Sequence, residues 1–298
     1  MSTSRITSND EREFYDGHYA QFLKLPDHAL RIDRRVLEAG FEDPAHPLYE
    51  RRILYRATVK ALEAEALQGR HVLDYGCGPA DFGLWMATEG ANVTLLDLSP
   101  MAIELALRRA SASAVTVRGV AADASRLDML GDGEFDLVFA CAALHHTLKY
   151  PGALAEIARV MKRGARLVLA ETWGGNPVLN LARKARAWAA GEAAEQGEGI
   201  IFSRRELRAL EPFFGELRVE PLNLLAMGKR VLRGRFDRGW ARAAMGCLES
   251  IDRELLAVAP SLGDWCGEAV VTGRRNEVGV GGYGSRNPSA ETTTPSSR

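Results

Sequence analysis

Two glycines and an acidic residue stand at spacings that suit the binding of a nucleoside cofactor. Gly76 and Gly78 lie one residue apart in a turn after a short apolar run, and Asp97 ends the next apolar run. Glycines let the backbone approach a ligand without an intervening Cβ, and a helix starting after the turn offers free N–H groups. An acid at the tip of the second strand can accept hydrogen bonds from a ribose diol. The segment 72–98 therefore predicts strand, glycine turn, helix, strand and ribose-binding acid.

The residue after the turn limits which nucleoside this site can take. A dinucleotide fingerprint needs a third glycine where this chain has Asp81. A pyrophosphate on that helix terminus would compete with the Asp81 carboxylate for the same donors. An amino group would instead be favoured by Asp74, two residues before Gly76. The pattern disfavours NAD and FAD and favours a cofactor that carries an ammonium group and a ribose but no phosphate.

Further motifs extend this pattern into a resemblance to a known family. D-x-G-x-G-P followed by an acidic strand tip resembles the S-adenosyl-L-methionine site of class I methyltransferases, and the resemblance covers roughly residues 67–275. Leu144-His145-His146 resembles the L-H-H ending of many small-molecule members. Val160-Met161-Lys162-Arg163-Gly164 resembles the turn before the family's fifth strand, with Met161 and Arg163 in place of leucine and proline.

The resemblance implies roles for individual residues. Gly76 and Gly78 would pass under the methionine part and the ribose, and Asp97 would hold the ribose hydroxyls. Asp123 with Ala124 would receive adenine, and Asp74 would face the methionine ammonium. The implied cofactor contacts are Asp74, Gly76, Gly78, Asp97, Leu98, Asp123, Ala124 and Cys141.

A histidine pair and an acid suggest how the acceptor is activated. Methyl transfer from a sulfonium is an in-line displacement, and a base is needed only when the acceptor must lose a proton. Histidine has a pKa near neutrality, and His145 and His146 follow the predicted fourth strand, at the sheet edge where ligands bind. Adjacent side chains are expected to point apart, so we predict His145 as the base. Glu171, at the tip of the fifth strand, is its expected partner.

The sequence constrains the identity of the methyl acceptor less than that of the cofactor. Tyr15, Tyr19 and Trp173 suit a flat or sugar-like acceptor, and His146 is a fourth tentative contact. Packing of the two tyrosines against the core is the alternative. The favoured function is O-methylation of a small molecule. A non-catalytic cofactor-binding module and an NAD(P)-dependent oxidoreductase are the competing hypotheses.

Alternating strands and helices from His71 onward must position these residues. The strand runs are apolar throughout, which suits strands covered on both faces and predicts a doubly wound, mostly parallel, seven-stranded α/β sheet. We expect an N-terminal helical lid over 1–66, with helices near 27–40 and 46–67, and the main domain over 67–275. A helical insertion is expected over about 225–262, with Trp240, Ala244, Leu248, Ile251 and Leu255 along one helix face. The Gly-, Ser- and Thr-rich segment 276–298 is expected to be a disordered tail.

Composition and charge exclude several other classes. The chain is 46% hydrophobic with mean hydropathy −0.15 and net charge −1, which gives no general attraction to nucleic acid. No run approaches the ~18 apolar residues of a membrane span, and the N-terminus has no signal-peptide core, so we expect a cytoplasmic protein. Scattered cysteines and histidines give no sign of a metal site. The basic residues of segment 229–242 predict a solvated helix face, with contact to an anionic surface as the alternative.

Overall fold

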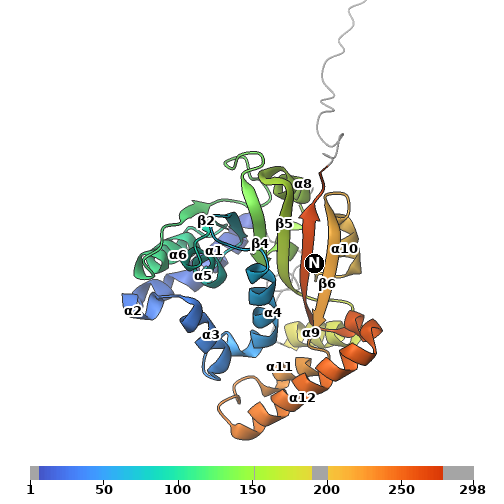
Figure 1. Ribbon diagram of the computed structural model, residues 1–298. Coiled ribbons are helices and arrows are strands. Elements are labelled where there is room, and N and C mark those ends of the chain that lie inside the picture. Colours follow the sequence, from blue (N-terminus) through green and yellow to red (C-terminus); the bar gives the residue numbers. More distant parts are fainter. Residues whose placement is uncertain (1–6, 151, 190–200, 278–298) are drawn as a thin grey trace, which may run out of the picture.

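The structure is a computed structural model that describes residues 7–150, 152–189 and 201–277. Seven strands form one sheet in the order β3-β2-β1-β4-β5-β7-β6 (Figure 1). β7 runs antiparallel to both of its neighbours, and the other adjacent pairs are parallel. The predicted doubly wound, mostly parallel sheet is confirmed. The strands are β1 His71–Tyr75, β2 Asn92–Asp97, β3 Arg118–Ala121, β4 Phe135–Cys141, β5 Met161–Thr172, β6 Phe214–Leu222 and β7 Glu268–Arg275.

Helices cover both faces of this sheet and precede it at the N-terminus. The N-terminal helices are α1 Ser8–Ala20, α2 Asp27–Leu30, α3 Arg34–Glu42 and α4 Arg52–Glu63, with 3₁₀ turns η1 Phe22–Lys24 and η2 Tyr49–Arg51. Those between strands are α5 Asp81–Thr88, α6 Pro100–Ala112, α7 Leu144–Thr147, α8 Ala153–Val160, α9 Pro177–Ala189 and α10 Arg204–Leu210. Between β6 and β7 lie η3 Leu225–Gly228, α11 Lys229–Leu232, α12 Gly239–Val258 and η4 Pro260–Trp265. Helices therefore occupy the expected insertion.

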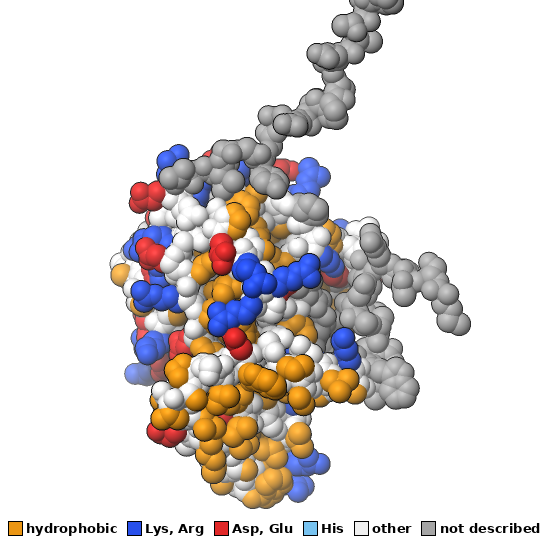
Figure 2. Space-filling view, turned by 90° about the vertical axis from the view of Figure 1, so that its right-hand side faces the viewer, with side chains coloured by type: hydrophobic (Ala, Val, Ile, Leu, Met, Phe, Trp, Pro, Cys, Tyr) orange, Lys and Arg blue, Asp and Glu red, His pale blue; other side chains and the backbone are white. Residues whose placement is uncertain are grey.

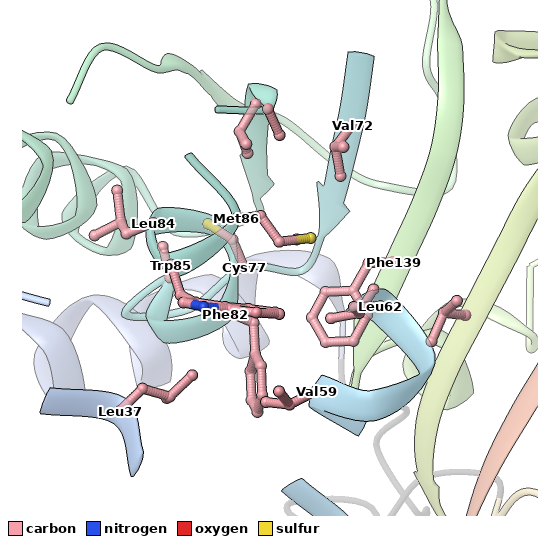
Figure 3. Packing of buried hydrophobic residues seen from close by; sticks show 14 of the residues in the cluster. Leu37, Val59, Leu62, Val72, Cys77, Phe82, Leu84, Trp85, Met86 and Phe139 are labelled. Carbon is pink, nitrogen blue, oxygen red and sulfur yellow. The ribbon is translucent and has the colours of Figure 1, made fainter. Parts of the chain in front are cut away.

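Alternate residues of the central strands supply two separate cores. On one face, Val72 of β1 and Phe139 of β4 pack with residues from α3, α4, α5 and α6. Phe82 of α5 lies 5.4 Å from Phe139 between ring centroids, in the middle of this cluster (Figure 3). On the other face, Leu73 of β1 packs with residues from α8 and α10. Burial on both faces explains why the strand runs are apolar throughout.

The N-terminal segment divides into two parts. The segment predicted as one helix over 27–40 is two helices, because Asp33 caps α3 by accepting a hydrogen bond from the backbone of Val36. α3 and α4 contribute Leu37 and Leu62 to the first core, whereas α1 buries none of its residues fully. Only α1 thus has the position of a lid, and its role as one stays a prediction.

The insertion presents an apolar surface. The fully buried residues of α12 include Ala241 and Met245, while Trp240 and Ile251 are 55% and 40% exposed. Hydrophobic side chains gather at this end of the molecule in Figure 2. The predicted apolar face of the helix is therefore only partly covered.

The predicted solvated face of segment 229–242 is exposed at Arg233, Arg235, Arg238 and Arg242, and Lys229 departs from the prediction. Lys229 is buried beside Glu268, and Arg233 is paired with Glu50. No helix in the described part of the chain is long and apolar enough to span a membrane. From residue 278 the expected tail lies outside the described residues, and Asn276 still pairs with the backbone of Phe213.

Candidate functional site

A cavity of about 310 Å³ opens at the carboxyl ends of β1, β2 and β4, between the sheet and α1. Its volume falls within the range of small-ligand sites. Every cofactor contact expected from the sequence borders it, from the glycine turn to Cys141. The described residues of this wall include Asp74, Gly76, Gly78, Asp97, Leu98, Asp123, Ala124 and Cys141, together with Tyr15, Tyr19 and His146.

The glycine turn is closely packed on both sides. Gly76 has φ +69°, and a Cβ there would lie 2.4 Å from the Cβ of Ala143. Gly78 has φ +51°, and a Cβ there would lie 2.7 Å from the hydroxyl of Tyr19. Both positions therefore require glycine, because a larger residue would be strained and would close the gap under α1.

Asp97, at the end of β2, is hydrogen-bonded to the backbone of the glycine turn. Its carboxylate accepts hydrogen bonds from the backbone N–H of Gly78 at 2.8 Å and from that of Ser99 at 2.9 Å. Burial raises the pKa of Asp97, although these hydrogen bonds oppose the shift. Each oxygen keeps a further lone pair, so the carboxylate can still accept from a ligand diol.

Asp74 and Asp123 lie in contrasting environments along the same wall. Asp74 is 3% exposed, and burial, aided by the charge of Asp97, raises its pKa to about 8. Asp123 is less buried; the hydrogen bonds that it accepts from Ser125 and Ser8 outweigh the effect of burial and lower its pKa. Thr7, the residue before Ser8, caps α1 by accepting a hydrogen bond from the backbone N–H of Asp10. Ser8 is thereby free to bond Asp123 across the cavity.

Arg109 of α6 secures the turn, and the sequence interpretation missed it. Its guanidinium donates to the Asp81 carboxylate at 2.7 Å, to the Leu30 carbonyl at 3.1 Å, and to the Pro79 carbonyl. Asp81 therefore stands where a dinucleotide fingerprint has its third glycine, and its ion pair with Arg109 holds the start of α5 in place. The wall has several carboxylates and no cluster of cations among its described residues, so its chemistry fits a positively charged nucleoside better than a pyrophosphate.

A second cavity of about 260 Å³ adjoins the first and shares Tyr15, Arg51, Ala142 and His146 with it. His145 borders this second cavity, and its Nδ1 lies 2.7 Å from Glu171 Oε2. The other Glu171 oxygen accepts the N–H of Leu144 at 3.1 Å, so the buried carboxylate fixes both the ring and the start of α7. Because the Glu171 oxygen accepts in this hydrogen bond, Nδ1 of His145 donates and Nε2 is left as an acceptor.

The expectation that the adjacent histidines point apart was wrong. Their ring centroids lie 4.2 Å apart, and both rings border the second cavity. Consecutive residues differ by about 100° on a helix such as α7, whereas they point to opposite sides only in extended chain. Burial, together with neighbouring His145, lowers the pKa of His146 to about 3, so this ring is neutral near pH 7.

The aromatic residues expected at the acceptor divide into two groups. Tyr15 and Tyr19 stack at 6.2 Å in the wall of the first cavity, and Tyr15 also borders the second. Trp173 is 1% exposed within the second core, against Phe202, and borders neither cavity. Its expected contact with substrate is therefore corrected: the side chain lies on the core side of the β5 end.

The known proteins that this chain resembles in sequence are described as methyltransferases. A family model described as a methyltransferase domain matches residues 73–169. The chain is 28% identical over 197 residues to a malonyl-[acyl-carrier protein] O-methyltransferase of Pseudescherichia vulneris, covering 65% of this chain and 74% of the relative. It is 34% identical over 113 residues to a demethylmenaquinone methyltransferase of Deinococcus radiodurans, covering 37% of this chain and only 46% of that protein.

The fold has solved counterparts at lower identity. The structure of a Haemonchus contortus phosphoethanolamine N-methyltransferase 2 aligns with a TM-score of 0.51 at 15% identity, covering 74% of this chain and 53% of that one. At this identity the likeness concerns the fold alone.

Proposed function

Since the chain belongs to the class I S-adenosyl-L-methionine-dependent methyltransferases, we propose that it methylates a hydroxyl oxygen of a small molecule. When bound, the cofactor supplies a methyl group activated by a sulfonium. The first cavity is the proposed cofactor site. Asp97 would hold the ribose, Asp123 with Ala124 would receive the adenine, and Asp74 would face the ammonium.

The observation that carries the proposal is the hydrogen bond between His145 Nδ1 and Glu171 at 2.7 Å. It leaves Nε2 of His145 as a proton acceptor, and His145 borders the second cavity, which adjoins the first. A hydroxyl placed there can lose its proton to Nε2 as its oxygen becomes nucleophilic, and Glu171 stabilises the resulting imidazolium. A base so oriented is needed for a hydroxyl acceptor.

Neighbouring side chains would align the acceptor. Neutral His146 and Tyr15 border both cavities, and burial raises the pKa of Tyr15, which keeps its proton. α1 and the two tyrosines cover the first cavity and would limit water there. Alignment of acceptor oxygen and methyl carbon accounts for much of the rate of such a displacement.

A screen of phenols, catechols and sugar hydroxyls, with methylated product detected by mass spectrometry, tests this function. For the best acceptor, His145→Ala should lower kcat by about 10²–10⁴-fold, the usual worth of a general base. Binding of S-adenosylhomocysteine, measured by calorimetry, should not change, because His145 does not border the first cavity. His28→Ala, on the exposed surface of α2, is the matched control. Full activity of His145→Ala on an oxygen acceptor would refute the assignment of the base.

A further inference from the structure

Arg51 lies where the two cavities meet and has no role in the proton transfer above. It ends η2, its side chain is 24% exposed, and it borders both cavities. Among the described residues that line them, it is the only lysine or arginine. A permanent cation is thus available to a ligand in either cavity.

A buried acid holds this side chain from behind. Arg51 Nε donates to Glu268 Oε1 at 2.9 Å. Oε2 of Glu268 accepts from Lys229 Nζ at 2.7 Å and from Asn223 Nδ2 at 2.5 Å. The Glu268 and Lys229 side chains are 2% and 3% exposed. Such ions are costly to bury, so the arrangement depends on every partner being present.

The cluster carries an excess of positive charge. Burial would raise the pKa of Glu268, but Lys229 and Arg51 outweigh it and lower the pKa to about 2, so this carboxylate is ionised. Two cations therefore share one anion.

Nearby acids do not supply the missing negative charge, because each has its own partner. Glu50 binds Arg233 at 2.6 Å through both oxygens, and Glu249 binds Arg52 at 2.5 Å. Glu171 lies on β5 next to the residue that pairs with Glu268 on β7. One of its oxygens accepts the Leu144 N–H and the other is hydrogen-bonded to His145. One positive charge remains unneutralised beside the cavities.

The geometry of the guanidinium shows what would neutralise it. Glu268 occupies Nε, and within the described part of the chain neither terminal nitrogen of Arg51 has a hydrogen-bond partner. The Tyr55 ring packs 5.7 Å from Arg51 Cζ. The two terminal nitrogens form a planar fork that matches the two oxygens of a carboxylate.

We propose that Arg51 is a carboxylate-binding residue at the junction of the cavities, and that Glu268 and Lys229 are positioning residues that hold its fork toward the ligand. The helical insertion, through Lys229, is thereby coupled to ligand binding. The proposal rests on the proposed function, since the carboxylate belongs either to the methionine part of the cofactor or to an acidic acceptor.

Two pairs of ligands distinguish these sources by calorimetry on the full chain. The first pair is S-adenosylhomocysteine and its decarboxylated analogue, which keeps the amine, thioether and adenosine. The second is salicylate and salicylamide, titrated into protein saturated with S-adenosylhomocysteine. Arg51→Met should weaken the carboxylate-bearing member of one pair by about ten- to a hundredfold and should not weaken the member that lacks the carboxylate. The affected pair identifies the source.

The positioning role is tested by Glu268→Gln and, should that variant not fold, by Lys229→Met. Either substitution should lower the affinity ratio between the carboxylate-bearing ligand and its partner in the same pair. Added to Arg51→Met, it should lower that ratio no further. Glu249→Gln, which removes a part-buried acid paired with Arg52, is the matched control and should preserve the preference.

The outcomes that overturn the proposal are distinct from failure of the proposed function. If Arg51→Met changes neither preference, Arg51 is not a carboxylate-binding residue. If Glu268→Gln lowers only the melting temperature, or weakens ligands with and without the carboxylate equally, its role is structural. Because these readouts are binding ratios, they do not depend on whether an oxygen acceptor is methylated.

Discussion

Three carboxylates of the first cavity differ in proton affinity although all are aspartates. Burial raises the pKa of Asp74 to about 8 and also raises that of Asp97, while hydrogen bonds lower that of Asp123. Near pH 7 the ligand-free protein therefore keeps a proton on Asp74. A cation bound beside Asp74 would stabilise its ionised form and expel that proton.

This predicts a pH dependence of cofactor binding. Between pH 6 and 7.5, the affinity for S-adenosylhomocysteine should rise by up to about tenfold per pH unit, because binding releases the Asp74 proton. Calorimetry in two buffers of different ionisation enthalpy should detect close to one proton released per ligand at pH 6.5. The sign follows from a pKa that is high in the free protein and lower in the complex.

Asp74→Asn is the control, since an amide has no proton to release. The variant should bind more weakly and show a flat pH profile over the same range. A wild-type affinity that is constant from pH 6 to 7.5 would contradict the placement of the ligand ammonium beside Asp74.

At the scale of elements, side chains from one helix hold the backbone of another segment in place. Arg109 reaches from α6 to Asp81 at the start of α5, to the carbonyl of Pro79 in the glycine turn and to that of Leu30 at the end of α2. Tyr75 similarly joins the end of β1 to the carbonyl of Ala124 at 2.6 Å and to Thr147 of α7 at 2.9 Å. The turns that border the first cavity thus depend on neighbours distant in sequence.

Arg109→Met should lower the free energy of unfolding by about 3 kcal/mol, because it removes the buried guanidinium that holds two backbone carbonyls and leaves the part-buried Asp81 carboxylate without its cation. Urea unfolding measures this loss. Adding Asp81→Asn should restore part of it. Arg126→Met, which breaks an exposed pair with Asp128, is the control and should cost less than about 1 kcal/mol. Equal losses for Arg109 and Arg126 would show that the turn does not depend on Arg109.

At the scale of the molecule, α1 is joined to the rest mainly by polar contacts across the site. Ser8 bonds Asp123 at 3.1 Å, Glu11 pairs with Lys149 at 2.7 Å, and Asp16 accepts from Ser99 at 2.5 Å. None of its residues is fully buried, whereas α5 buries five of its eight. Segments with few buried apolar contacts open at low free-energy cost.

Hydrogen exchange followed by mass spectrometry should therefore show α1 exchanging much faster than α5 in the ligand-free protein. S-adenosylhomocysteine should slow α1, because a ligand in the cavity adds contacts to its tyrosines, and should leave α8 unchanged. If α1 were as protected as α5 without ligand, it would be a fixed wall of the cavity and not a lid.

Local patterns explain why the residues that border the first cavity were predictable from the sequence. A glycine turn between two buried strands needs particular φ angles and small residues, and an acid at a strand end is a local feature. Gly76, Gly78 and Asp97 consequently border one cavity, as their spacing indicates. The apolar strand runs follow from burial on both faces of the sheet, whereas the strand order was seen only in the structure.

By itself the sequence determined the alternating strands and helices through backbone periodicity, and the glycine turn with its acids through short spacings. The cofactor class and the His145–Glu171 pair followed from the resemblance of these motifs to a known family. Only the tertiary structure decided that both histidine rings border the second cavity, that Trp173 lies in the core and that Lys229 is buried. Arg51 meets Glu268 across 217 positions of the chain, and no local pattern encodes such a contact. Long-range packing determines which side chains share a cavity, so the acceptor side of the site depends on the fold.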